Sequence, residues 1–145
     1  MALIKGKVGI VSCSGEEIPE GTISRIATRL VLEKLRPDET VTICLPLFLA
    51  GGEGERAFAK LFPTITVDGC EKRCAQIGTK KYSGKPFATI VVTQVLKKHP
   101  KLNLKSRDEL SVSEFELAEK VAEEIARTVD DALNMGKSQI RSEGI

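Results

Sequence analysis

Short apolar runs alternate with segments of helical periodicity along most of the chain. Runs with strand character lie at residues 7–12, 40–43, 64–67 and 87–93. Between them, apolar positions three and four residues apart predict helices over residues 22–35, 55–62 and 70–81. Pro37 and Pro63 mark the ends of the first two helices, because proline cannot continue a helix. The pattern is therefore a repeat of strand and helix.

The final part of the chain has the clearest helical pattern, an apolar stripe that continues over several turns. Ser111 and Glu114 have the spacing of a capping box at its start. Gly136 suits the cap at its end. We therefore expect a single domain over residues 1–136, followed by a mobile tail over residues 137–145.

A chain that alternates strands and helices predicts a parallel sheet with right-handed crossover connections. The expected fold class is α/β: a three-layer α/β/α domain, Rossmann-like or flavodoxin-like, with a short, mainly parallel sheet of about four strands. The strand orders 2-1-3-4 and 3-2-1-4 both satisfy the pattern. In either order the first three strands are neighbours, so their carboxyl ends lie ~4.8 Å apart along one edge.

Composition indicates the class of protein but not its binding partners. The chain has 145 residues, of which 41% are hydrophobic and 29% charged, as in one soluble globular domain. The net charge of +2 is too small to indicate nucleic-acid binding. No segment approaches the ~20 apolar residues that span a membrane, and no secretory signal is evident, so we expect a cytoplasmic protein. Partners and oligomeric state stay open.

Four cysteines carry the candidate chemistry. Cys13, Cys44 and Cys70 each follow an expected strand, and Cys74 lies one helical turn beyond Cys70. In open α/β folds the carboxyl edge of the sheet is where ligands bind. In a reducing compartment, cysteines are more often ligands or reactive groups than disulfides. The pattern therefore predicts a shared metal or redox site at this edge.

The alternative is that each cysteine is packed as a small hydrophobic residue. Cys44, which lies between Ile43 and Leu45, suits this alternative best. The spacing of the cysteines is also not that of the paired Cys-x-x-Cys of a zinc ribbon. The case for a site therefore depends on the four cysteines meeting at one edge.

The residues around Cys70 support a reactive or coordinating sulfur. The expected helix places Cys70 near its N-terminus, where free amides and the helix dipole favour thiolate. Lys72 and Arg73 add positive charge nearby. Gly69 permits a sharp turn from strand to helix. Asp68 can hydrogen-bond an N–H of the cysteine loop or supply an oxygen ligand.

The Asp-Gly-Cys sequence at residues 68–70, followed by Cys74 and preceded by Cys13 and Cys44, resembles the DGC-domain family. That family is named for this central motif. Its four chelating cysteines imply a zinc-binding domain, and no reaction follows from the resemblance. The resemblance covers most of the chain between the first and fourth expected strands. A departure is the apolar stretch after Cys44, which is longer than the family pattern leads us to expect.

The resemblance implies that Cys13, Cys44, Cys70 and Cys74 hold zinc. Four thiolates close the shell of Zn²⁺ and leave no position for water, which favours a structural or carrier role. The same ligands allow iron or an iron–sulfur cluster. No catalytic residue is assigned, and the single histidine, His99, is interpreted as a surface residue.

Two further hypotheses remain open. One is a thiol-based redox or sulfur-transfer enzyme, in which Cys70 is the nucleophile and Cys74 or Cys13 resolves the intermediate. The other is a small-ligand binding module in which the cysteines only shape a pocket.

Overall fold

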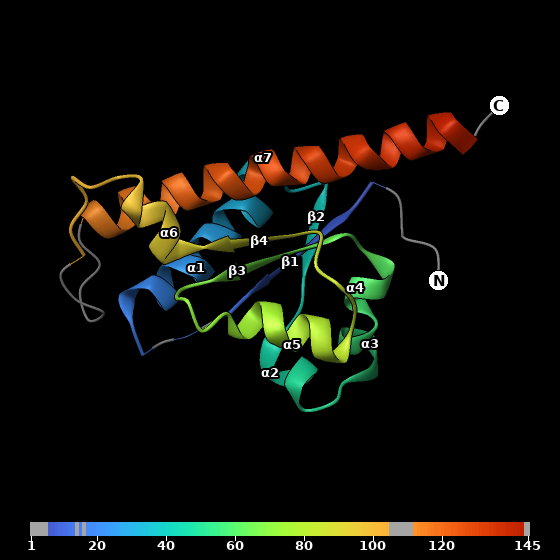
Figure 1. Ribbon diagram of the computed structural model, residues 1–145, viewed down its shortest axis with the longest axis horizontal. Coiled ribbons are helices and arrows are strands. Elements are labelled where there is room, and N and C mark those ends of the chain that lie inside the picture. Colours follow the sequence, from blue (N-terminus) through green and yellow to red (C-terminus); the bar gives the residue numbers. More distant parts are fainter. Residues whose placement is uncertain (1–5, 14, 16, 105–111, 144–145) are drawn as a thin grey trace.

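A computed structural model describes residues 6–13, 15, 17–104 and 112–143, with side chains described as far as residue 135. One parallel sheet of four strands in the order β2-β1-β3-β4 forms its centre (Figure 1). The strands are β1 (Val8–Ser12), β2 (Thr40–Thr42), β3 (Thr64–Asp68) and β4 (Ala88–Val91). The expected α/β class and the first of the two expected strand orders are confirmed.

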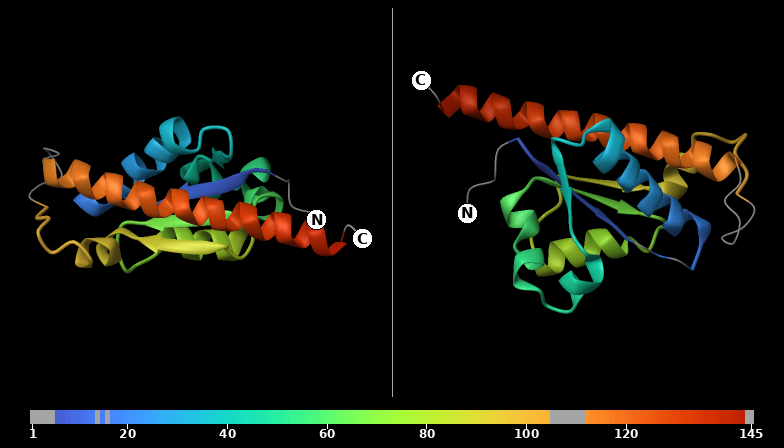
Figure 2. Two further views of the ribbon diagram at one scale, coloured as in Figure 1. Left: turned by 90° about the horizontal axis from the view of Figure 1, so that it is seen from above. Right: turned by 180° about the vertical axis from the view of Figure 1, so that it is seen from behind.

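Helices cover both faces of the sheet (Figures 1 and 2). The α7 face is covered by α1 (Pro19–Leu30), the π-helix η1 (Val31–Leu35), α6 (Val92–Lys97) and α7 (Val112–Glu143). The α5 face is covered by α2 (Leu45–Leu49), α3 (Glu53–Arg56), α4 (Phe58–Leu61) and α5 (Cys74–Tyr82). The two faces have separate hydrophobic cores.

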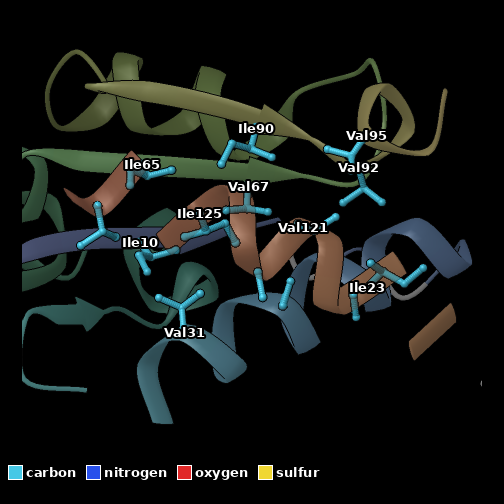
Figure 3. Close-up of a cluster of buried hydrophobic side chains, with 14 of the residues drawn as sticks. Ile10, Ile23, Val31, Ile65, Val67, Ile90, Val92, Val95, Val121 and Ile125 are labelled. Atoms are coloured by element: carbon cyan, nitrogen blue, oxygen red, sulfur yellow. The ribbon is translucent and has the colours of Figure 1, made fainter. Parts of the chain in front are cut away.

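The core of the α7 face is aliphatic (Figure 3). Alternate strand residues point into it because successive side chains of a strand point to opposite faces. They meet the apolar stripes of α1 and α7. Each of the core residues is at most 5% exposed: Val8, Ile10, Ile23, Ala27, Val31, Ile65, Val67, Ile90, Val92, Val95, Leu117, Ala118, Val121, Ala122, Ile125, Val129 and Ala132.

The core of the α5 face is smaller and contains two aromatic rings. Its buried members are Val11, Leu45, Phe48, Phe58 and Ala75, and Cys13 packs against them. The ring of Phe58 occupies the place that a side chain at Gly9 would take, since a Cβ there would lie 2.3 Å from Phe58 Cε1. The absence of a side chain at Gly9 of β1 thus leaves room for α4 to pack its Phe58 ring against this face of the sheet.

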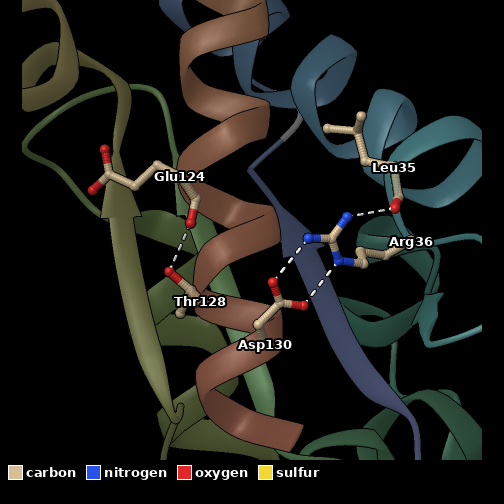
Figure 4. Close-up of polar contacts among 5 residues, drawn as sticks. All are labelled: Leu35, Arg36, Glu124, Thr128 and Asp130. Carbon is tan, nitrogen blue, oxygen red and sulfur yellow. Dashed lines mark hydrogen bonds and ion pairs between the residues drawn. The ribbon is translucent and has the colours of Figure 1, made fainter.

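An ion pair joins the residue that follows η1 to α7 (Figure 4). Arg36 Nε donates to Asp130 Oδ1 at 2.9 Å, and Arg36 Nη2 donates to Asp130 Oδ2 at 2.8 Å. This bidentate bond raises the pKa of Arg36 and lowers the pKa of Asp130. Both side chains are partly exposed, so solvent screens the pair.

Several expected boundaries are wrong. The helix expected over residues 70–81 begins only at Cys74. The strand expected over residues 87–93 ends at Val91, and α6 follows at once. The short helix α2 was not expected at all. The last two cases are apolar runs, and composition does not separate a short strand from a short helix.

The final helix is longer than the pattern predicts. α7 has 32 residues and continues through Gly136 to Glu143, so the expected cap at Gly136 is wrong. Ser111, the other expected cap, lies outside the described residues. The domain limits and the mobile tail over residues 137–145 stay predictions. Within the part of the chain that is described, no helix combines the length and apolar character that crossing a membrane requires.

Candidate functional site

The four cysteines follow the carboxyl ends of three adjacent strands. Cys13 comes directly after β1, Cys44 and Cys70 come two residues after β2 and β3, and Cys74 begins α5. In the sheet, Ile10 of β1 is paired with Thr42 of β2, and Ser12 of β1 is paired with Val67 of β3. All four cysteines therefore lie on segments that leave the same edge of the sheet.

The cysteines differ in exposure. Cys13 and Cys70 are half-buried, Cys44 and Cys74 are exposed, and all four are free thiols. Cys44 is therefore not the buried hydrophobic residue of the packing alternative. Across residues 6–135, excluding the undescribed positions, no group of three or more His, Cys, Asp or Glu side chains is arranged to hold a metal ion. The structure brings the cysteines to one edge without assembling a coordination shell.

The sulfur of Cys13 has two polar neighbours. The backbone N–H of Gly69 donates to Cys13 Sγ at 3.3 Å, and Ser24 Oγ lies 3.4 Å from the same sulfur. The Ser24 hydroxyl donates to the Gly21 carbonyl at 2.6 Å. Because a hydroxyl has one hydrogen, the thiol of Cys13 is then the donor to Ser24. Cys13 is thus held between α1 and the loop that carries Cys70.

Asp68 is the last residue of β3 and is 1% exposed. Its Oδ1 accepts the N–H of Ala75 at 2.7 Å, and its Oδ2 accepts the N–H of Gln76 at 3.1 Å. Burial raises the pKa of Asp68, although these two hydrogen bonds and the charge of Arg73 oppose the rise. Of the two roles open to Asp68 from sequence, hydrogen bonding is the one observed, and its donors lie in the first turn of α5.

Gly69 has a different role from the expected sharp turn, since its φ is not positive. A Cβ at Gly69 would lie 2.7 Å from the backbone nitrogen of Gly21. A Cβ at Gly21 would in turn lie 1.6 Å from the carbonyl oxygen of Gly15. Gly21 and Gly69 therefore allow the β1–α1 loop, the start of α1 and the β3–α5 loop to pack backbone against backbone.

The start of α5 also changes the interpretation of the cationic residues. Because α5 begins at Cys74, Cys70 does not lie near a helix N-terminus as expected. Cys74 occupies the N-terminal position instead. Arg73 precedes it with φ 54° and ψ 48°, a left-handed conformation that costs a residue with a Cβ. The N–H of Arg73 donates to the Cys70 carbonyl at 3.2 Å. Lys72 is exposed in this turn.

Sequence reasoning missed the polar residues that surround the motif. Ser24 and Thr93 lie in helical segments where nothing in the local pattern marks them. Thr93 Oγ1 donates to Glu71 Oε1 at 2.8 Å, and the N–H of Thr93 donates to the Gly69 carbonyl at 3.3 Å. The start of α6 is thereby tied to the same loop. Gly21, in the first turn of α1, did carry a signal, because glycine often marks close backbone approach.

His99 lies in a different part of the molecule. It lines an open cavity of ≈ 430 Å³ between α6 and α7, together with Val95, Lys98, Lys120, Glu123, Glu124 and Arg127. Charges of both signs line it, and Lys98 is 3.7 Å from Glu124. His99 is half-buried and contributes nothing to the cysteine edge.

Comparison with known proteins gives one family. Neither the curated proteins nor the solved structures compared with this chain gave a match. The model of the DGC domain matches residues 9–129, which includes the sheet, all four cysteines and most of α7. The chain therefore belongs to the DGC-domain family.

Proposed function

We propose that this protein binds zinc through Cys13, Cys44, Cys70 and Cys74. The observation that carries the proposal is that four free thiols leave the same edge of one sheet, from three adjacent strands. Thiolate sulfur is a preferred ligand of Zn²⁺ in structural sites. The donor set fits the metal in kind, and the family membership is consistent with it.

Two contacts connect the segments that carry the four cysteines. Cys13 is hydrogen-bonded to the amide of Gly69, the residue before Cys70. Cys44 and Cys74 stand at the starts of α2 and α5, which pack against each other where a Cβ at Gly78 would lie 3.7 Å from Phe48 and Leu49. Since no shell is assembled in the described residues, zinc binding requires the four sulfurs to move closer together.

A bound zinc would act by cross-linking the loops that follow β1, β2 and β3. Four thiolates leave no open position for water, so the site suits a structural or metal-carrier role over hydrolysis. Lys72 and Arg73 place positive charge beside the negative shell. Iron or an iron–sulfur cluster could use the same donors, and metal analysis separates these possibilities.

The test is the metal content of protein purified without chelator. We expect about one zinc per chain by native mass spectrometry and elemental analysis, and a strong loss of zinc in each of C13S, C44S, C70S and C74S. Met135→Ser is the matched control, because it removes an exposed sulfur from α7, away from the edge. A metal-free chain in which all four thiols are readily alkylated would refute the proposal.

A second candidate is a thiol-based redox or sulfur-transfer enzyme. The observation in its favour is that Cys44 and Cys74 are exposed, so a substrate can reach them. In this hypothesis the Cys70 thiolate attacks a disulfide substrate, releasing one substrate thiol and forming a mixed disulfide. Cys74 or Cys13 then attacks the Cys70 sulfur, which releases the second substrate thiol and leaves the two protein cysteines oxidised to a disulfide. This candidate predicts disulfide-reductase activity in metal-free protein, and loss of that activity in C70S.

A further inference from the structure

The first turn of α5 lacks a cap of its own. A helix leaves its first amides without partners inside the helix, and the residue before it commonly supplies a side-chain acceptor. Here that residue is Arg73, whose side chain makes no cap hydrogen bond. The first hydrogen bond within the helix runs from the N–H of Ile77 to the Arg73 carbonyl at 3.0 Å. The amides of Ala75 and Gln76 therefore need an acceptor from elsewhere.

Asp68 supplies that acceptor from the end of β3. One carboxylate oxygen serves each amide, at 2.7 Å from Ala75 and 3.1 Å from Gln76. Ala75 is fully buried, so water cannot replace the carboxylate there. Cys74 directly precedes these two residues. The position at which α5 begins, and with it the position of Cys74, therefore depends on Asp68.

The other end of the same loop is also fixed. Gly69 packs on the backbone of Gly21, donates to Cys13 Sγ and accepts the N–H of Thr93. Between this anchor and the capped amides the chain has only the turn at residues 70–73. Cys70 and Cys74 are thus held at the two ends of a short segment whose limits are both set by the Asp-Gly pair.

We propose that Asp68 is the positioning residue of the cysteine site: it holds Cys74 in place by capping α5 and does not itself bind the metal. This inference rests on the proposed zinc binding, and it adds a residue that acts through a ligand. The observed contacts support the capping role, because both carboxylate oxygens accept helix amides and the side chain is 1% exposed.

The first experiment uses the unmodified protein and needs no zinc. Hydrogen bonds from the Ala75 and Gln76 amides to the Asp68 carboxylate should give slow amide exchange and measurable coupling across the hydrogen bonds to the carboxylate carbon by NMR. If zinc is then bound, both signals should persist. Loss of both signals on adding zinc would mean that Asp68 leaves the helix to coordinate the metal, which would overturn the inference.

The second experiment compares Asp68→Asn with Thr66→Val. Asparagine keeps one acceptor oxygen and turns a donor toward the second amide. Thr66 is a buried neighbour on the same strand and face, and its hydroxyl is hydrogen-bonded to Thr89 at 2.9 Å, away from α5. We expect D68N to weaken zinc binding by about tenfold relative to T66V, as removal of an outer-shell partner does, with faster exchange at Ala75 and Gln76.

The possible results separate this inference from the proposed function. Equal zinc affinity in D68N and T66V would overturn the positioning role, as would unchanged exchange at the two amides. Absence of zinc from the unmodified protein would refute the proposed function, while slow exchange at Ala75 and Gln76 would still support the cap. If D68N does not fold, the NMR measurements on the unmodified protein decide the question.

Discussion

The two faces of the sheet are built from the same strands but differ in chemistry. On β3, Ile65 and Val67 point into the aliphatic core of the α7 face, while Thr66 and Asp68 occupy the alternate positions toward the α5 face. Directly after β1, Cys13 packs on the α5 face as well. Strand alternation thus places the larger aliphatic core on one side, and Asp68 and Cys13 on the other, beside the smaller core of the α5 face.

This difference shows why the candidate site lies on the α5 side. Long amphipathic helices can cover an apolar face without specific polar contacts. The short helices of the other face bring helix ends close to the sheet, and each end needs a partner. Asp68 serves the start of α5, and Arg56 Nε donates to the Phe48 carbonyl at 3.0 Å near the end of α2. The buried polar groups on this face therefore have a structural role, which is to pair with the free backbone groups of helix ends.

The largest effect should come from the core of the α7 face. Leu117→Ala removes a fully buried side chain and should lower the free energy of unfolding by about 3 kcal/mol, because it leaves a cavity. Phe115→Ala on the same helix, where the ring is 52% exposed, is the matched control and should change it by less than about 0.5 kcal/mol. Urea denaturation measures both, and similar losses would contradict the assignment of the core.

A smaller effect is expected where β1 meets the α5 face. Gly9→Ala places a Cβ 2.3 Å from the Phe58 ring and should cost about 2 kcal/mol of stability, since the ring is buried and cannot move freely. Phe58→Leu in the same chain should recover part of this loss. A double-mutant cycle by thermal or urea unfolding gives the coupling energy. Simple additivity would mean that the ring does not occupy this space.

The ion pair between Arg36 and Asp130 lies at the surface of the α7 face, and its removal measures how much this contact contributes to stability. Asp130→Asn should destabilise the protein by roughly 0.5–1 kcal/mol at neutral pH, a modest value because solvent screens the pair. The pKa of Asp130 is lowered in the folded state. The contribution is therefore present above the unfolded pKa of about 3.9 and is lost as pH falls through the folded pKa. A gap between the two proteins that persists unchanged at about pH 2 would contradict this origin.

The smallest effect concerns the turn beside the site. Arg73 has a left-handed backbone, which glycine adopts without strain. Arg73→Gly should therefore raise the free energy of unfolding by roughly 0.5 kcal/mol, after the entropy that glycine gains in the unfolded chain is subtracted. Lys72→Gly, in the same turn but without a positive φ, is the control and should not stabilise the protein. Urea denaturation compares the two, and destabilisation by Arg73→Gly would show that its side chain matters more than its backbone.

The sequence predicted the sheet well, because apolar runs and the prolines between them indicate where strands begin and end. The four expected strands exist, and Pro37 and Pro63 lie in the connections before β2 and β3. The start of α5 could not be predicted, since its cap comes from Asp68, six residues earlier and on another element. The contacts of Cys13 with Gly69 and Ser24 were equally hidden, because they depend on how α1 lies against the edge of the sheet.

The close approaches at Gly21 and Gly69 have a consequence for which substitutions this chain can accept. A Cβ at Gly21 would meet the carbonyl oxygen of Gly15, and a Cβ at Gly69 would meet the backbone nitrogen of Gly21. In both cases the obstacle is backbone, which no substitution of the neighbouring residue removes. Mutation of a neighbouring side chain, which often compensates for a substitution at a packed position, therefore cannot make room for a side chain at Gly21 or Gly69. Libraries built to vary the cysteine loops should leave Gly21 and Gly69 fixed.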